Sequence, residues 1–308
     1  MNSLVIGSRG SQLALAQTNL VAGSIRTSHP GLEVAITVIK TTGDRFAASS
    51  LSALAQDTKG LFVKEIEEAL LAGTIDLAVH SLKDVPTEVP AGLCLAITPE
   101  REEPWDAFVS NRPLTSLDEV PPEAKVGTSS LRRKLQLASL RPDLEIVPIR
   151  GNIDTRIRKL REGQFDGIIL AAAGLSRLGF DDLITYTFSV EEMVPAIGQG
   201  CLALEVREND APVLRIIKNL DHANTKKSVN AERLFLKRMG GGCQVPMGAY
   251  AALSQDKAEF FAFLASPAGD RSIKKSFVGS SVQLNNLVEE AVASFRSLGS
   301  DDLMKEVD

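Results

Sequence analysis

The sequence is poor in the residues that build disulfide frameworks and metal sites. Its 308 residues include only three cysteines, Cys94, Cys201 and Cys243, and no Cys-x-x-Cys pair. The histidines also number three and lie far apart, so they form no metal-ligand pattern. So few unpaired cysteines exclude a disulfide scaffold and indicate a reducing compartment. We therefore expect neither a structural metal nor a disulfide.

Long apolar runs and nucleotide-binding glycine motifs are missing as well. No stretch reaches the length of a membrane span, and the first residues follow a strand pattern without a signal peptide. Both observations lead us to expect a cytoplasmic protein without a membrane partner. The two common phosphate-binding glycine loops are absent. A net charge of -5 argues further against binding of nucleic acid.

Positive charge is nevertheless concentrated in one segment of this acidic chain. Residues 125–161 contain ten Lys or Arg side chains against three acidic ones. A basic segment in an acidic protein indicates an acidic ligand that is bound in one place.

Strand and helix patterns alternate along most of the sequence, which predicts parallel βαβ units. Closely spaced strand patterns after residue 244 predict a small antiparallel sheet instead. We thus expect two α/β domains, at residues 1–99 with 195–218 and at 100–194, and a C-terminal α+β domain at 219–308. The predicted strands are residues 4–8, 32–40, 75–79, 93–98, 125–127, 145–150, 166–173, 201–206, 244–253, 259–265 and 272–278. The predicted helices are residues 11–26, 59–72, 129–140, 152–162, 226–239 and 284–296.

Arginines follow the ends of several predicted parallel strands, where ligands of such sheets bind. Their planar guanidinium groups donate two hydrogen bonds at once to a carboxylate, and helix N-termini at the same edge add free N–H groups. Any one of these arginines would fit an ordinary solvated position. Six of them phased to strand ends favour one crevice that binds a ligand with many carboxylates. The six are Arg9, Arg132, Arg133, Arg150, Arg156 and Arg177.

Cys243 follows three consecutive glycines, which leave the space beside its sulfur free of side chains. A bulky group could be attached there, because a thiolate is a strong nucleophile and a thioether is permanent. The alternative is a glycine helix cap followed by a buried cysteine. Asp84, beside Lys83, is the acidic residue of the predicted crevice and suits a reaction that develops positive charge. Its alternative role is that of a turn aspartate before Pro86.

Seven segments together resemble the porphobilinogen deaminase family, also called hydroxymethylbilane synthase, over essentially the whole chain. Each segment alone is a weak signal, and their combination is specific. They are GSRGSxLA at residues 7–14, KGLFVKE at 59–65, HSLKDVP at 80–86, GTSSLRR at 127–133, RGN at 150–152, GQG at 198–200 and GGCQVP at 241–246.

This resemblance implies two domains like those of type II periplasmic binding proteins and a third domain that carries the cysteine. Cys243 would hold a dipyrromethane cofactor by a thioether. The protein would be a monomeric transferase of tetrapyrrole (porphyrin and heme) biosynthesis. It would join four porphobilinogen units in sequence, with loss of ammonia, and release hydroxymethylbilane by hydrolysis.

The family's functional residues carry over to matching positions. Asp84 would contact pyrrole N–H groups, assist loss of the amine and stabilise the cation that forms. The residues that would bind cofactor carboxylates are Ser81, Lys83, Thr128, Ser129, Arg132, Arg133 and Arg156. The residues that would bind the incoming ring are Arg9, Ser11, Gln17, Lys59, Phe62, Arg150, Arg177 and Gln199.

One segment departs from the family pattern, and two other functions remain open. Residues 47–58 lack the Gly/Lys-containing run that usually precedes Lys-Gly-Leu-Phe, so the contacts of this predicted mobile loop (43–58) are in doubt. A non-catalytic binding protein for an acidic molecule would explain the arginines but not the glycines before Cys243. A cysteine hydrolase or acyltransferase would need a histidine motif, and the sequence offers none.

Overall fold

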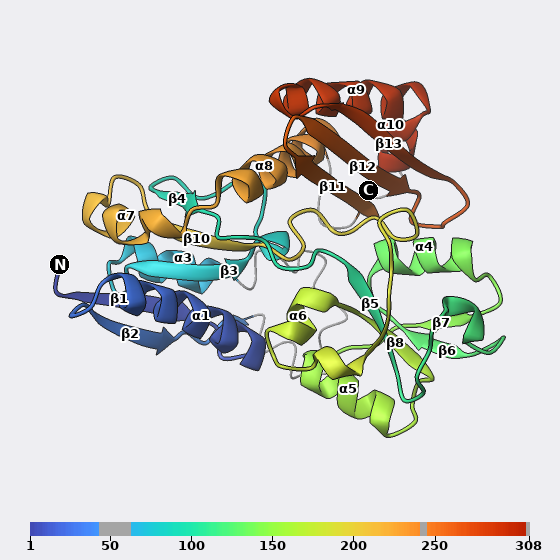
Figure 1. Ribbon diagram of the computed structural model, residues 1–308, viewed down its shortest axis with the longest axis horizontal. Helices are drawn as coiled ribbons and strands as arrows, with labels where there is room; N and C mark the ends of the chain where they lie inside the picture. The colour runs from blue at the N-terminus through green and yellow to red at the C-terminus, as the bar shows by residue number, and fades with distance from the viewer. Residues whose placement is uncertain (43–62, 241–244, 306–308) are drawn as a thin grey trace. The chain divides into compact units, whose positions relative to one another are not determined.

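A computed structural model describes residues 1–42, 63–240 and 245–305, which form two compact units (Figure 1). The first unit contains Met1–Glu102 and Cys201–Lys226, and the second contains Glu103–Gly200 and Lys227–Asp308. The chain therefore leaves the first unit after Glu102 and returns to it at Cys201. These crossing points lie close to the predicted ones at residues 99/100 and 194/195, while the division into three domains stays a prediction.

The first unit is built on a five-stranded mixed sheet with the order β2-β1-β3-β10-β4. β1 runs parallel to β2 and β3, whereas β10 is antiparallel to β3 and β4. The strands are β1 (Ser3–Ser8), β2 (Glu33–Val38), β3 (Leu77–Ser81), β4 (Leu93–Ile97) and β10 (Leu202–Arg207). The helices are α1 (Gln12–Ser28), α3 (Lys64–Leu71) and α7 (Ala211–Ile217).

The two faces of this sheet are covered by different helices, because side chains alternate along each strand. Leu77 and Val79 of β3 point to the face where they pack with Val21 and Ile25 of α1. Ala78 points to the opposite face, in the cluster that contains Ile66 of α3. His80, two residues after Ala78, therefore lies on the α3 face.

The second unit contains a five-stranded sheet with the order β7-β6-β8-β5-β9. Its parallel strands β7, β6 and β8 match β2, β1 and β3, and its antiparallel β5 occupies the place of β10. The strands are β5 (Asp106–Ser110), β6 (Lys125–Gly127), β7 (Glu145–Val147), β8 (Gly167–Ala171) and β9 (Ile184–Thr187). The helices are α4 (Leu131–Leu140), α5 (Ile153–Arg161) and α6 (Ala172–Ser176). Both sheets thus share one strand order, with the antiparallel strand formed just after the chain crosses.

The second unit also contains the antiparallel sheet β11-β12-β13, whose central strand β12 is buried on both faces. Alternate residues of β12 face opposite ways: Phe260 packs with Phe235 and Phe295, while Phe261 and Phe263 pack with Val194. This explains why β12 reads as a nearly continuous apolar run. The elements are α8 (Ala223–Arg238), β11 (Met247–Ser254), β12 (Lys257–Ala265), β13 (Ser272–Ser280), α9 (Leu284–Ser297) and α10 (Ser300–Lys305), and Figure 1 shows α9 lying across the sheet.

The predicted class of two α/β domains and a small α+β domain is confirmed. The predicted parallel βαβ units are present, and each sheet also contains an antiparallel strand that follows a crossing. Strand 166–173 was predicted too long, since the helix α6 begins at Ala172. The sequence patterns also missed β5, β9, α7 and α10. Residues 43–58 and 59–62 lie outside the described part of the chain.

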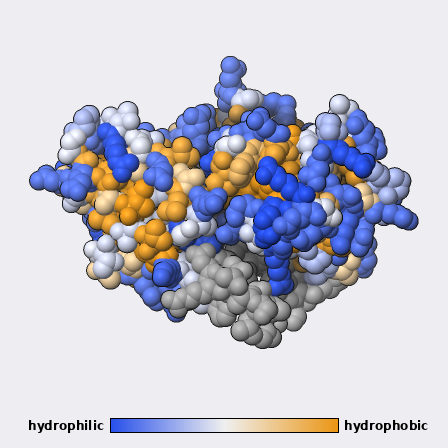
Figure 2. All heavy atoms as spheres, turned by 90° about the horizontal axis from the view of Figure 1, so that it is seen from below, coloured by the Kyte–Doolittle hydropathy of each residue, from blue (hydrophilic) through white to orange (hydrophobic). Residues whose placement is uncertain are grey.

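Exposed apolar side chains are scattered over separate elements. Leu20 of α1, Leu140 of α4 and Val282 are all exposed. On the face in Figure 2, hydrophobic areas are separated by hydrophilic side chains. Single exposed apolar residues are normal in folded proteins. Within the described ranges, no helix is both long and apolar enough to cross a membrane.

Candidate active site

In the first unit, the carboxyl ends of β1 and β3 meet because these strands are parallel neighbours. Arg9 follows β1, and Ser81 ends β3. The chain then makes a 3-10 turn, Leu82–Asp84, that is held by the buried Leu82 side chain and by its N–H, which donates to Cys201 O at 3.0 Å. Asp84 is half-buried and makes no hydrogen bond or ion pair with another described residue. Its carboxylate is available to a ligand.

Gln17 and Ser81 are brought together at this edge. The Gln17 amide Nε2 donates to Ser81 Oγ at 2.9 Å, and Gln17 is buried. Ser11 caps helix α1, because its Oγ accepts from the Ala14 N–H at 3.3 Å. The family resemblance names Gln17, Ser81 and Ser11 as ligand contacts, and the structure adds local hydrogen bonds to each.

In the second unit, the parallel strands β7, β6 and β8 bring their carboxyl ends to one edge. Thr128 follows β6 directly, and Arg150 comes shortly after β7. Arg177 lies at the end of α6, which follows β8, and its Nη2 donates to Gly200 O at 2.6 Å. The predicted phasing of arginines to strand ends is therefore met within this unit.

The hydroxyl groups at this edge organise the start of α4. Thr128 Oγ1 accepts from the Ser130 N–H at 3.2 Å, and Ser130 Oγ accepts from the Arg133 N–H as the helix cap. Ser129 Oγ donates to Ile149 O at 2.7 Å and so links the helix start to the end of β7. The sequence predicted these residues as ligand contacts, and their described contacts shape the edge itself.

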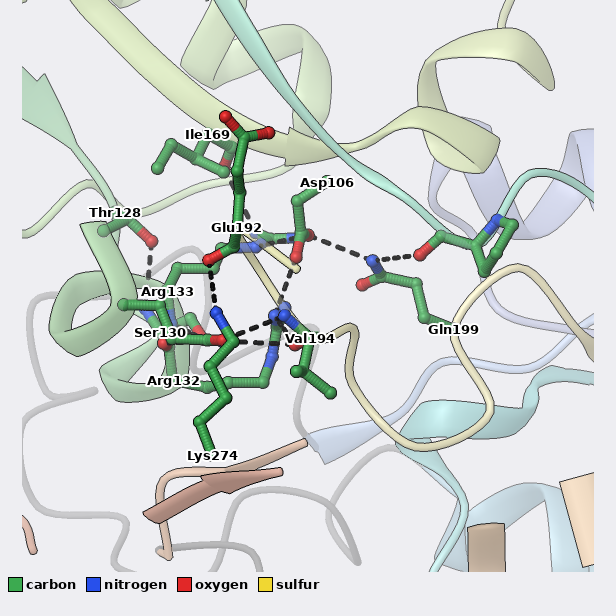
Figure 3. Close-up of polar contacts among 12 residues, drawn as sticks. Asp106, Thr128, Ser130, Arg132, Arg133, Ile169, Glu192, Val194, Gln199 and Lys274 are labelled. Carbon is green, nitrogen blue, oxygen red and sulfur yellow. Dashed lines mark hydrogen bonds and ion pairs between the residues drawn. The ribbon is translucent and has the colours of Figure 1, made fainter. Parts of the chain in front are cut away.

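Arg132 and Arg133 converge on one buried carboxylate, that of Asp106 at the start of β5 (Figure 3). Arg132 Nη1 donates to Asp106 Oδ2 at 2.7 Å, and Arg133 Nε donates to Oδ1 at 2.8 Å. Gln199 Nε2 approaches Oδ1 from another side, at 3.0 Å. Arg132 also donates to Val194 O at 2.7 Å. Asp106 therefore joins α4 to both segments in which the chain crosses between units.

The charges of this cluster do not cancel, because two guanidinium groups face one carboxylate. Burial on its own would raise the pKa of Asp106, but the attraction of Arg132 and Arg133 outweighs it and holds that pKa far below its usual range. Asp106 is ionised at neutral pH, so the three side chains together carry an excess positive charge. This excess lies at the carboxyl edge of the second unit's parallel strands.

Arg156 of α5 adds a further positive charge at the same edge. Its Nε donates to Gly151 O at 2.7 Å, and it has no carboxylate partner among the described residues. Burial, together with repulsion from Arg133, lowers the pKa of Arg156 to about 10. The guanidinium stays charged at neutral pH in surroundings that disfavour its charge. An anion bound beside it would relieve this cost.

Asp106 is the functional residue that sequence reasoning missed. Residues 100–104 were interpreted as a linker, and the strand that follows was not recognised. A signal was present, since Asp106 precedes the apolar run Ala107, Phe108 and Val109, which is typical of a short buried strand. Three predicted site residues, Lys59, Phe62 and Cys243, lie outside the described part of the chain.

Two family models cover nearly the whole chain. Residues 4–215 match the porphobilinogen deaminase, dipyrromethane cofactor binding domain, and residues 226–293 match the porphobilinogen deaminase, C-terminal domain. The chain belongs to the porphobilinogen deaminase family. It is therefore a transferase with porphobilinogen deaminase (hydroxymethylbilane synthase) activity in tetrapyrrole biosynthesis, and it contains a dipyrromethane cofactor binding domain. This confirms the resemblance drawn from the seven segments.

Full-length relatives agree with the family models. The chain is 48% identical over 307 residues to a porphobilinogen deaminase of Geobacter sulfurreducens, which covers 100% of this chain and 95% of the relative. It is 46% identical over 304 residues to that of Trichlorobacter lovleyi, covering 99% and 96% of the two chains. These matches favour neither the non-catalytic binding protein nor the cysteine hydrolase or acyltransferase.

Among solved structures, the chain is similar to the periplasmic aliphatic sulphonate binding protein SsuA from Escherichia coli. The identity is 13%, the TM-score is 0.39, and the match covers 78% of this chain and 71% of that one.

Proposed function

We propose that this porphobilinogen deaminase uses both strand edges, with carboxylate binding mainly by the guanidinium groups of the second unit and chemistry by Asp84 of the first. The observation that carries this proposal is a contrast in partners. Arg156 is charged and has no described counter-ion, and Asp84 is a half-buried carboxylate with no described partner. Arg156 is therefore suited to bind an anion, and Asp84 is suited to bind a cation or an N–H donor.

The residues of the second unit fit a dipyrromethane, because this group carries several carboxylates. Arg156 is the best-supported carboxylate ligand, since its charge is not neutralised. Arg132 and Arg133 would contribute their excess charge while Asp106 holds them in place, and Thr128 and Ser129 would shape the edge. Ser81 and Lys83 of the first unit complete the proposed set. When bound, the dipyrromethane supplies the pyrrole to which the first substrate unit is joined.

The incoming porphobilinogen carries an acetate, a propionate and an aminomethyl group. We assign Arg9, Arg150 and Arg177 to its carboxylates, with support from Ser11, Gln17 and Gln199. The Asp84 carboxylate would accept a pyrrole N–H and stabilise the positive charge that develops on the substrate as ammonia leaves. A carboxylate held near such charge contributes roughly 3–4 kcal/mol to catalysis.

Cys243 is proposed as the attachment point of the cofactor, through a thioether. The mass of the intact purified protein tests this directly. Wild-type protein should exceed the mass of its sequence by one dipyrromethane, and peptide mapping should place the addition on Cys243. Cys243→Ser should lose the added mass and the activity, whereas Cys94→Ser and Cys201→Ser should keep both. An active protein with no added mass, or one modified at Cys94, would refute the assignment.

We also propose that the protein acts in the cytoplasm as a monomer, without a membrane or nucleic-acid partner. The small number of cysteines supports the reducing compartment. Light scattering on the purified protein should give the mass of one chain, and a dimer mass at micromolar concentration would contradict this part of the proposal.

A further inference from the structure

A second buried acid–base pair lies in the first unit, and its histidine stands four residues before Asp84 in the chain. His80 of β3 and Glu205 of β10 are both buried, and the His80 Nε2 lies 2.9 Å from Glu205 Oε2. The strands are antiparallel neighbours, with Ala203 opposite His80 and Glu205 opposite Ala78. The two side chains are therefore diagonal neighbours on the face covered by α3.

His80 is the main group that can offset the negative charge of Glu205. Among described residues Glu205 has no Lys or Arg partner, and its Oε1 is buried without a hydrogen-bond partner. Burial and then the Glu205 charge raise the pKa of Glu67 on α3. Burial, followed by the charges of Glu208 and Glu205, raises the pKa of Cys94 on β4. A polar pair in such a place is costly unless it is well satisfied, so the Nε2–H of His80 must donate to Glu205.

The pair holds the end of β3, from which the catalytic turn begins. His80 immediately precedes Ser81, and Asp84 closes the 3-10 turn that follows. The chain at β10 contacts this end of β3 in two further ways. Leu202 pairs with Ser81 across the strands, and Cys201 O accepts a hydrogen bond from the Leu82 N–H. The side-chain bond from His80 to Glu205 thus adds a third link between β10 and the start of the turn.

We propose that His80 and Glu205 are positioning residues for Asp84, with Glu205 fixing His80 and thereby the carboxyl end of β3. Neither residue touches the substrate in this role. The inference rests on the proposed function of Asp84. Because a displacement of about 1 Å can cost roughly 100-fold in rate, loss of the pair should lower turnover without abolishing binding.

The test replaces His80 and Glu205 in variants that distinguish an effect on the position of Asp84 from a loss of folding. His80→Leu alone leaves a buried charge at Glu205 and risks unfolding. The double variant His80→Leu/Glu205→Leu removes both polar groups and should fold. We expect its turnover, per mole of cofactor-loaded enzyme determined by intact mass, to fall about 10- to 100-fold with KM changed less than about threefold. His80→Gln retains an N–H donor for Glu205 and should recover most of the rate.

Two controls match the changes made. Glu208→Gln removes an exposed carboxylate just after the same strand, and His222→Gln replaces a half-buried histidine of the same unit whose Nδ1 lies 2.8 Å from Thr225 Oγ1. Both should leave turnover unchanged. The sequence contains three histidines, so NMR of protein labelled with 15N in histidine should resolve the His80 Nε2 proton. Its signal should be slow to exchange in the wild type and should shift or disappear in Glu205→Leu.

A double-mutant cycle with Asp84→Asn separates this inference from the proposed function. If the pair acts through Asp84, its loss should cost little further rate when Asp84→Asn is already present. Equal losses in both backgrounds would overturn the inference, as would a folded double Leu variant with wild-type turnover. Normal turnover in Asp84→Asn alone would instead refute the proposed role of Asp84.

Discussion

The two five-stranded sheets share one strand order but differ in the charged side chains at their carboxyl edges. The first unit ends its central strand in a turn with a half-buried, unpartnered carboxylate, Asp84. The second unit ends its parallel strands in guanidinium groups whose charge exceeds that of the acid between them. One strand order therefore supports edges with different sets of charged side chains, because strand order determines where side chains meet and not which they are.

A second likeness between the sheets is a buried acid on the antiparallel strand. Glu205 of β10 pairs with His80 in the first unit, and Asp106 of β5 pairs with Arg132 and Arg133 in the second. In both units the chain supplies this acid soon after it crosses. The difference lies in the partner, since Glu205 meets a single histidine whereas Asp106 leaves a net positive charge. Each buried acid therefore fixes side chains next to its carboxyl edge: Glu205 fixes one histidine, whereas Asp106 fixes two arginines.

The largest effect should come from Asp84 at the edge of the first unit. Asp84→Asn keeps the shape of the side chain but removes the charge that would stabilise the developing cation. We expect kcat to fall roughly 100-fold or more, with the dipyrromethane retained. Arg150→Leu, at the basic edge, should act mainly on KM. Steady-state kinetics, with the cofactor content of each variant checked by intact mass, would measure both parameters. A loss of kcat in Arg150→Leu as large as that in Asp84→Asn would refute the proposal that Asp84 supplies the chemistry and Arg150 the binding.

The second effect concerns the acid that holds the basic edge. Asp106→Asn leaves two buried guanidinium groups without their counter-charge, so the free energy of unfolding should fall by about 3–5 kcal/mol at pH 7. The folded-state pKa of Asp106 lies below its unfolded value of about 3.9, so its stabilisation is present above that pH and is lost as the pH falls through the folded pKa. Denaturant unfolding at several pH values should therefore show the variant and the wild type converging in acid.

Asp143→Asn is the matched control for this change. Asp143 also pairs with an arginine, Arg141 at 2.6 Å, but at an exposed position. Its replacement should cost far less stability than that of Asp106, because solvent screens exposed pairs. Equal losses from the two variants would show that burial of the Asp106 cluster is not what makes it important.

The third effect concerns Arg156, whose replacement should weaken cofactor binding without lowering stability. Because the folded-state pKa of Arg156, about 10, lies below its ordinary value, its charged form opposes folding at neutral pH. Arg156→Leu should therefore leave the melting temperature of the cofactor-free protein unchanged or raise it. The same variant should acquire its cofactor about tenfold less efficiently, measured as the loaded fraction by intact mass.

Arg158→Leu, on the same helix, provides the comparison. Arg158 is exposed and pairs with Glu162 one turn later, at 2.8 Å. Its loss should not alter the fraction of protein that carries cofactor, and should change stability by no more than a few tenths of a kcal/mol. A clear drop in melting temperature for cofactor-free Arg156→Leu would mean that Arg156 has a structural role.

The smallest effect should be the same in both units. Ser11 and Ser130 cap the helices that follow β1 and β6, the first strand of each parallel set. Ser11→Ala and Ser130→Ala should each cost about 1 kcal/mol of unfolding free energy, measured by denaturant titration. A Ser11→Ala variant with unchanged stability but raised KM would assign Ser11 to the substrate and not to the helix.

The sequence alone was sufficient for the parts of this protein that depend on local pattern. Strand 125–127 was predicted with its observed bounds, and α4 and α5 within two residues of theirs, because periodicity and capping residues act over one helix turn. The phasing of arginines to strand ends was also readable, since it depends only on where each strand stops. The same local patterns carried the family resemblance.

Only the tertiary structure decided which buried charges meet. Arg132 lies 26 positions from Asp106, and His80 lies 125 positions from Glu205. No periodicity connects such residues, because their contact depends on the antiparallel strands β5 and β10 that enter each sheet after the chain crosses. The direction of those strands was likewise hidden from sequence, since an apolar strand reads the same whether its neighbour is parallel or antiparallel.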